Sequence, residues 1–232
     1  MTEAITFDVD GTLVNSVDAH AQAWHEAFRE FGFDVGVAQA RTQIGKGGDQ
    51  LLPIFLSPLE LESVGDELEA YRSKLFESKY LERVKPFARV PDLFGLLKER
   101  GVKTGVASSF QAAELKYYLA LCQISALVDV QATGEDVQNS KPSPDVVEVV
   151  LRRFGNPPKA GVWMVGASPF DAESATRAGI RAVGVRCGGF PSEDLLAAGC
   201  IALFEDPEDL WKKFDGSVLS PTRQETAHVP HR

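Results

Sequence analysis

Two carboxylates lie two residues apart near the beginning of the chain, at Asp8 and Asp10 of the stretch FDVDGT. Residues 4–10 alternate apolar and polar side chains, a pattern typical of a strand with one buried face. On this pattern the two acids share the other face, about 7 Å apart, which leaves room between them for a small reacting group. Because Asp is depleted in strands, the pair indicates acids held for nucleophilic or acid–base chemistry.

A surface turn is the simpler interpretation of the same residues. Asp10 and Gly11 form the Asp-Gly pair that favours a tight β-hairpin, and the acids would then lie on a solvent-exposed strand. A hairpin needs a second strand, whereas residues 13–24 become helical in pattern. We therefore favour the chemical interpretation.

Hydroxyl and amino side chains follow later elements that could lie beside these acids. Ser108 ends a predicted strand and, with Gln111, has the spacing of a capping box for the next helix. That role is compatible with phosphate binding, because the free N–H groups of a helix N-terminus bind phosphate oxygens, and Ser109 would add a hydroxyl. Lys141 precedes Pro142, which predicts extended backbone just before a helix. Taken alone, this residue is interpreted as a solvated lysine.

The elements that must position these residues alternate regularly from residue 89 onward. Apolar runs predict strands at 102–109, 126–133, 161–168, 180–186 and 201–206, in addition to 4–10, and amphipathic stretches predict helices at 91–101, 110–121, 143–155, 170–179, 192–199 and 207–215. Such alternation predicts an α/β fold, a doubly wound (Rossmann-like) parallel sheet covered on both faces. Ligands of such folds bind beyond the carboxyl ends of the strands.

The segment after the first strand shows no convincing strand pattern. Residues 18–32 have helical periodicity, and further helices, broken at Pro53 and Pro58, are expected to follow. His20 and His25 are five residues apart, share no helix face well, and are assigned to packing or to the surface. The expected parts are an α/β core of 1–15 and 86–216, a small all-helical cap of 16–85, and a flexible tail of 217–232.

Bulk composition limits the classes of function. The 232 residues carry a formal net charge of -9. This charge disfavours nucleic acid or an anionic membrane as a partner, because both bind preferentially to basic surfaces. The 3 cysteines show no Cys-x-x-Cys spacing, which argues against a disulfide framework or a zinc site. We see no signal peptide and no apolar stretch long enough to span a bilayer. We expect a cytoplasmic protein. The negative net charge does not exclude a small anionic substrate.

Four stretches occur in a fixed order along the chain: DVDGT, GVASS, SKPSPD and VGASPFD. Together they resemble the four motifs of the haloacid dehalogenase-like superfamily, whose members are mostly phosphatases and phosphotransferases. The helical insertion between the first two motifs is similar to the small cap of the phosphoglycolate phosphatase and β-phosphoglucomutase branch. The resemblance spans about residues 5–185 and implies Mg²⁺-dependent hydrolysis of a small phosphorylated metabolite.

The resemblance also implies a role for each candidate residue. Asp8 would be the nucleophile that forms an aspartyl-phosphate, and Asp10 the acid–base residue for the leaving oxygen and for water. Ser108 and Lys141 would stabilise the phosphoryl charge. The implied ligands of Mg²⁺ are Asp8, Asp10 (through its backbone carbonyl) and Asp171. The implied substrate contacts near the first two motifs are Gly11, Thr12 and Ser109.

The fourth stretch departs from the family pattern. It normally opens with Gly-Asp, but here Ala167 follows Gly166, at the position of a direct magnesium ligand. Loss of a metal contact costs at least about 10–100-fold in affinity or activity, unless Asp171 or water fills the gap. SPFD is also an ordinary helix start, with Ser168 as N-cap and Asp171 as an early acid. Ala167, whether natural or introduced, predicts weak magnesium binding and slow or absent turnover.

The cap contains the glycine-rich stretch QIGKGGDQ, residues 43–50. It is not a Gly-x-Gly-x-x-Gly fingerprint, because Gln50 stands at the last position, and it is not a P-loop, because Gly47 follows Lys46. In related capped enzymes the corresponding loop descends over the site, so Lys46 and Arg41 are candidates to contact the non-phosphate part of the substrate. A flexible turn with a solvated lysine is the alternative.

Three other functions stay open on the sequence. A sugar phosphomutase would use the same residues and return the phosphoryl group to the sugar. A 2-haloacid dehalogenase also attacks with the first aspartate and needs no magnesium, although such enzymes generally lack an acid like Asp10. A pseudophosphatase would bind a phosphorylated ligand or protein without turnover, which Ala167 favours.

Overall fold

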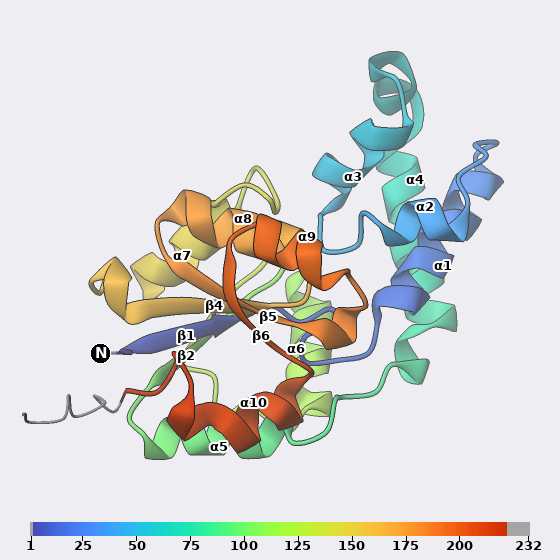
Figure 1. The fold of residues 1–232 in the computed structure, drawn as a ribbon. Coiled ribbons are helices and arrows are strands. Elements are labelled where there is room, and N and C mark those ends of the chain that lie inside the picture. The colour runs from blue at the N-terminus through green and yellow to red at the C-terminus, as the bar shows by residue number, and fades with distance from the viewer. Residues whose placement is uncertain (1, 222–232) are drawn as a thin grey trace, which may run out of the picture.

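The computed structural model describes residues 2–221 and contains a six-stranded sheet. The strand order is β3-β2-β1-β4-β5-β6, and neighbouring strands run parallel. The strands are β1 (Ala4–Phe7), β2 (Lys103–Ala107), β3 (Val130–Ala132), β4 (Val162–Gly166), β5 (Arg181–Val185) and β6 (Cys200–Phe204). Helices cover both faces of the sheet in Figure 1, which confirms the doubly wound α/β fold.

Alternate residues of the strands pack into two separate helical layers. Ile5 and Phe7 point into a core shared with the first layer, whereas Ala4 and Met164 point into a core shared with the second. The first layer comprises α5 (Val90–Glu99), α6 (Ala112–Leu121) and α10 (Pro207–Lys213), and the second comprises α7 (Asp145–Arg153), α8 (Pro169–Ala178) and α9 (Ser192–Ala197). The central strands β1 and β4 are buried along their whole length on both faces, as is typical of parallel sheets, whereas the edge strands β3 and β6 are partly exposed.

The central strand β1 places the first motif at the edge where the carboxyl ends meet. Phe7 is opposite Val106 of β2 and Val165 of β4. The residues that follow these three strands therefore emerge side by side, which is where ligands bind in such sheets.

A helical unit stands over this edge of the sheet (Figure 1). It consists of α1 (Val17–Glu30), α2 (Val37–Arg41), α3 (Gly48–Phe55), α4 (Pro58–Lys79) and the short 3₁₀ helix Leu81–Arg83. It has a core of its own that includes Trp24, Phe28 and Leu68. The two linkers to the sheet pair with each other, since Asn15 N–H donates to Lys85 O at 2.9 Å. We propose that these linkers are the boundaries of the 16–85 cap.

Two details of these elements differ from the sequence expectation. Pro53 lies inside α3 rather than ending a helix, whereas Pro58 is the first residue of α4, where its missing N–H costs nothing. Within the predicted tail of 217–232, Leu219 is fully buried in the core, and residues 222–232 lie outside the described residues.

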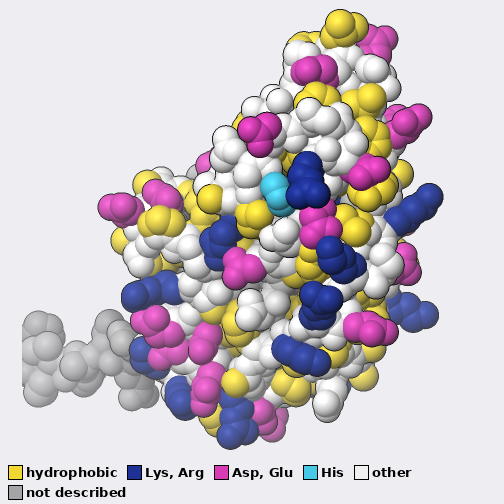
Figure 2. Space-filling view, turned by 90° about the vertical axis from the view of Figure 1, so that its right-hand side faces the viewer, with side chains coloured by type: hydrophobic (Ala, Val, Ile, Leu, Met, Phe, Trp, Pro, Cys, Tyr) yellow, Lys and Arg dark blue, Asp and Glu magenta, His cyan; other side chains and the backbone are white. Residues whose placement is uncertain are grey.

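Two surface properties bear on the possible partners. None of the helices within residues 2–221 has the length and apolar character needed to cross a membrane. On the face shown in Figure 2, Lys and Arg side chains are interspersed with Asp and Glu.

Candidate active site

A tight turn after β1 carries the two acids of the first motif. The strand ends at Phe7, so Asp8 and Asp10 lie on the turn and not on a strand face, which corrects the sequence expectation. Gly11 has a φ of 69°, and an added Cβ there would lie 2.7 Å from Gly188 Cα, so the turn requires glycine. Both acids line one cavity of about 40 Å³.

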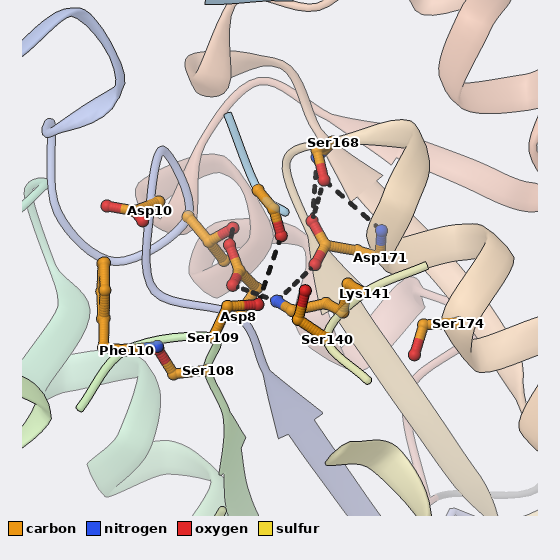
Figure 3. Close-up of polar contacts among 12 residues, drawn as sticks. Asp8, Asp10, Ser108, Ser109, Phe110, Ser140, Lys141, Ser168, Asp171 and Ser174 are labelled. Carbon is orange, nitrogen blue, oxygen red and sulfur yellow. Dashed lines mark hydrogen bonds and ion pairs between the residues drawn. The ribbon is translucent and has the colours of Figure 1, made fainter. Parts of the chain in front are cut away.

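Asp8 is buried against a cation supplied from a distant part of the chain. Lys141 Nζ lies 2.5 Å from Asp8 Oδ1 and 2.8 Å from Asp171 Oδ1, with all three side chains buried (Figure 3). The second oxygen, Asp8 Oδ2, accepts a hydrogen bond from Thr12 Oγ1 at 3.2 Å. The backbone N–H of Asp8 donates to Val165 O at 2.9 Å, which ties the turn to β4. Residues from the first, third and fourth motifs therefore meet here.

Burial and charge set the protonation of this cluster. Burial, and then the negative charge of Asp171, raises the pKa of Asp8 to about 7, while Lys141 acts in the opposite direction. Burial lowers the pKa of Lys141, but the adjacent Asp171 and Asp8 carboxylates outweigh it and hold that pKa above its ordinary value. Lys141 is thus a buried cation at neutral pH, able to offset the charge of a phosphoryl group.

Asp171 serves the start of α8 and the lysine at the same time. Ser168 is the N-cap, and its Oγ and N–H donate to Asp171 Oδ2 at 2.7 and 2.9 Å. This capping box confirms the predicted helix start. Asp171 Oδ1 accepts from Lys141, so both carboxylate oxygens already have partners.

Asp10 faces the cap. Its Oδ1 accepts a hydrogen bond from Ser16 and lies 3.1 Å from His20 Nε2, which is not aligned to donate to it. The His20 ring stacks on Phe76, with centroids 3.8 Å apart, and its Nε2 lies 3.8 Å from Glu114 Oε1. His20 is therefore a packing residue, as expected, but it also lines the cavity beside Asp10.

The serines of the second motif have different surroundings. Ser108 is buried, and its Oγ accepts from Phe110 N–H at 3.1 Å. The N-cap of α6 is Gln111, so the predicted capping box with Ser108 is wrong, because the hydroxyl is used by the turn that precedes the helix. Ser109 lines the cavity, and its Oγ donates to Gly45 O of the cap at 3.4 Å.

The cavity lies between the cap and the core. Its walls are Asp8, Asp10, Ser109 and Phe110 from the core and His20, Trp24, Ile44, Gly45, Lys46, Gly47, Gly48, Glu69 and Arg72 from the cap. A second cavity of about 300 Å³, between α4 and α6, shares Glu69, Arg72, Ser109 and Phe110 with the first. The two cavities offer a small chamber for a reacting group beside a larger one for the rest of a substrate.

Comparison with known families decides which chemistry this geometry belongs to. Residues 5–185 match the family described as haloacid dehalogenase-like hydrolase. The chain belongs to this hydrolase family. The match includes all four motifs and the cap, as expected from the resemblance.

Relatives of this hydrolase are named as phosphatases. The phosphorylated carbohydrates phosphatase of Thermotoga maritima is 28% identical over 212 residues, which cover 90% of this chain and 96% of that protein. The phosphoglycolate phosphatase of Escherichia coli K12 is 29% identical over 205 residues, which cover 79% of this chain and 81% of the other.

Solved structures share the fold of the hydrolase over nearly its whole length. A hydrolase from Pseudomonas syringae superposes with a TM-score of 0.83 at 24% identity, covering 93% of this chain and 99% of that one. CbbY from Rhodobacter sphaeroides, solved in complex with phosphate, has a TM-score of 0.70 at 25% identity, covering 90% and 96% of the two chains.

The fourth motif leaves an incomplete set of metal ligands. Ala167 is buried against the Gly188 loop and offers only a methyl group. Within residues 2–221 no three His, Cys, Asp or Glu side chains are placed to hold a metal ion together. Asp8 still provides a hard carboxylate oxygen, and magnesium commonly keeps several waters and takes substrate phosphate as a ligand. Asp8 therefore offers the kind of ligand that magnesium prefers.

The two cations predicted to reach the substrate lie in different places. Lys46 lines the cavity, where its Nζ donates to Gln43 Oε1 at 2.7 Å and lies 4.5 Å from the centre of the Phe170 ring. Burial lowers the pKa of Lys46. Arg41 is not brought to the cavity, because its guanidinium pairs with Asp18 at 2.7 Å and donates to Gly188 O at 3.2 Å.

Sequence reasoning missed an arginine that lines both cavities. Arg72 of α4 lies over the Trp24 ring at 4.7 Å, and its Nε is buried without a hydrogen-bond partner among the described residues. Glu69 and Glu114 also line the larger cavity, and burial raises the pKa of both carboxyl groups. No sequence motif marks Arg72, since its position depends on how the cap folds over the core.

Proposed function

We propose that this hydrolase cleaves a small phosphate monoester through an aspartyl-phosphate on Asp8. The observation that carries the proposal is the buried Lys141–Asp8 pair at 2.5 Å, beside a cavity that Asp10 also lines. The names of the relatives, phosphatases of phosphoglycolate and of phosphorylated carbohydrates, support the same class of reaction.

The residues of the chain divide the reaction between them. An Asp8 oxygen attacks phosphorus, the P–O bond to the alcohol breaks, and Asp10 gives the leaving oxygen a proton. Asp10 then takes a proton from water, the water oxygen attacks phosphorus, and inorganic phosphate leaves Asp8. Lys141 and the Ser108 hydroxyl stabilise the charge on the phosphoryl group, and Asp171 keeps Lys141 in place.

The proposal includes a magnesium ion that binds weakly. Asp8 and the backbone carbonyl of Asp10 would hold it, and when bound it supplies positive charge that offsets two meeting anions. With Ala167 in the fourth motif and both Asp171 oxygens engaged, we propose that magnesium binds weakly.

The larger cavity supports a substrate with a sizeable leaving group. Its roughly 300 Å³ is lined by polar side chains such as Arg72, Gln111 and Glu114 and by the ring of Tyr117. We propose a phosphorylated metabolite whose oxygen atoms contact this wall and Lys46. A cytoplasmic location remains a prediction from the sequence.

Phosphate release from a panel of esters, with magnesium titrated, tests the proposal directly. We expect the rate of phosphate release to rise with magnesium concentration and to approach its maximum only at high concentration. After an acid quench, intact-mass measurement should find one added phosphoryl group, and peptide mapping should place it on Asp8. Absence of both release and label at every magnesium concentration would contradict the proposal.

Ala167 is the observation that favours a second candidate, a 2-haloacid dehalogenase, because such an enzyme needs no metal at that position. Halide release from 2-haloacids, independent of magnesium and without phosphatase activity, would support it. Asp10, which lines the cavity beside Asp8, favours a phosphatase over a dehalogenase.

A further inference from the structure

The glycine-rich stretch of the cap contacts the core loops that carry the catalytic residues. We call residues 45–49 the cap loop. Gly47 N–H donates to Ser140 Oγ at 2.8 Å, and Ser140 N–H donates to Asp49 Oδ2 at 2.9 Å. Ser109 Oγ donates to Gly45 O at 3.4 Å. The cap loop is therefore joined by hydrogen bonds to the second and third motifs (Figure 3 shows the positions of Ser109 and Ser140).

The glycines allow this close approach. An added Cβ at Gly47 would lie 2.7 Å from Ser140 Oγ and 2.8 Å from Ser140 Cβ. An added Cβ at Gly45, whose φ is 112°, would lie 2.7 Å from Ser168 Oγ. Side chains at either position would push the cap loop away from the core. This explains a stretch that matches no phosphate-binding or dinucleotide-binding motif.

The two serines that hydrogen-bond to the cap loop, Ser109 and Ser140, each stand next to a catalytic residue. Ser109 follows Ser108, and Ser140, which is buried, precedes the buried Lys141. Ser140 makes two hydrogen bonds to the cap loop: its N–H donates to Asp49 and its Oγ accepts from Gly47. Its backbone is thus fixed one residue before the lysine that contacts Asp8 at 2.5 Å.

We propose that Asp49 and Gly47 are positioning residues, which hold Ser140 and thereby set Lys141 against Asp8 only while the cap is closed. The inference rests on the proposed function and adds a link between cap closure and catalysis. Catalytic geometry is then completed by the cap itself, in addition to its role in covering the substrate. A displacement of reacting groups by about 1 Å can cost 100-fold in rate, so a small slip of Lys141 suffices.

Asp49→Ala tests the link through the kinetics of the whole chain. With p-nitrophenyl phosphate we expect kcat to fall about 10–100-fold, while KM changes less than about twofold, because Asp49 does not line the small cavity. Asp49→Asn keeps an acceptor oxygen and should restore most of kcat. Asp34→Ala, which removes an exposed cap carboxylate, is the matched control and should behave as the unaltered protein. Unchanged kcat in Asp49→Ala overturns the proposal.

A measurement without turnover separates this inference from the proposed function. The NMR signal of the Lys141 ammonium and the amide exchange rate of Gly47 report the network directly. We expect Asp49→Ala, and not Asp34→Ala, to shift the ammonium signal and to speed exchange at Gly47. If the protein hydrolyses no ester, the proposed function fails, and these signals still decide the link. An ammonium signal that is identical in both variants overturns it.

Discussion

Lys141 contacts Asp8 at 2.5 Å although 133 residues separate them in the chain. Lys141 lies in the loop between β3 and α7, while Asp8 follows the central strand β1, so the contact depends on how the sheet brings these segments together. The pair is buried, and a buried ion pair is retained for stability only where its geometry and its other hydrogen bonds are good. Thr12 on Asp8 and Asp171 on Lys141 supply those further bonds.

Asp8→Asn should abolish turnover and the covalent label while the fold persists. The amide has nearly the same shape: its oxygen can accept from Lys141 and its NH₂ can donate to Thr12 Oγ1, but it is not a nucleophile. Phosphate release should fall below detection, and the far-ultraviolet circular dichroism spectrum should stay the same. Asp92→Asn, at an exposed pair with Arg89, is the matched control and should keep full activity. Covalent label in Asp8→Asn would show that another residue is the nucleophile.

The prediction from sequence succeeded where a contact follows from topology. Asp8, Lys141 and Asp171 come after or between strands of one parallel sheet, so their convergence at its carboxyl edge could be expected. The prediction failed where the exact first residue of a helix decides the role of a side chain. Ser108 has capping-box spacing to Gln111, yet the helix begins after Gln111 and the hydroxyl turns to Phe110.

Cap residues were the hardest to place because their neighbours come from another part of the chain. Arg41 was expected near the substrate, but Asp18 and the carbonyl of Gly188 hold it elsewhere. Arg72 was not expected at all, because α4 is polar on several sides and its pattern does not reveal which side faces the core. Such contacts depend on the angle between cap and core, which periodicity does not encode.

Ala167→Asp should create a stronger magnesium site at a cost in stability without the metal. The new carboxylate would be buried, because Ala167 is 1% exposed, and an uncompensated buried charge is destabilising. Thermal unfolding should occur at lower temperature in chelator, and magnesium should raise the midpoint more than in the unaltered protein, because it binds the folded state. Turnover should saturate at lower magnesium.

Ala167→Asn is the control for that change, since it adds nearly the same volume without the charge. It should show little response of the unfolding midpoint to magnesium. If Ala167→Asp responds to magnesium no more than Ala167→Asn, then this position is not beside a metal site.

Two N-cap serines provide a matched test of the role of Asp171. Ser168 caps α8 and Ser57 caps α4, each with a capping box to an acid three residues on. Ser→Ala at either position should cost about 1 kcal/mol of unfolding free energy in urea titrations. Ser168→Ala should also reduce kcat, because it frees the carboxylate that holds Lys141, whereas Ser57→Ala should leave kcat unchanged. Equal kcat in the two variants would mean that Ser168 acts only as a helix cap.

Arg72→Ala should weaken recognition of the leaving group more than catalysis. Arg72 lines both cavities, and its buried Nε has no hydrogen-bond partner within residues 2–221, so we expect it to donate to a substrate oxygen in the larger cavity. A hydrogen bond from a charged donor contributes about 1.5–3 kcal/mol, which corresponds to a rise in KM of about 10–100-fold. Phenyl phosphate, whose leaving group carries no further oxygen, should show almost no change in KM. Arg72→Lys keeps the charge but not the forked donors, so it should give an intermediate KM for the oxygen-rich ester. Equal losses for both esters would place Arg72 at the phosphoryl group instead.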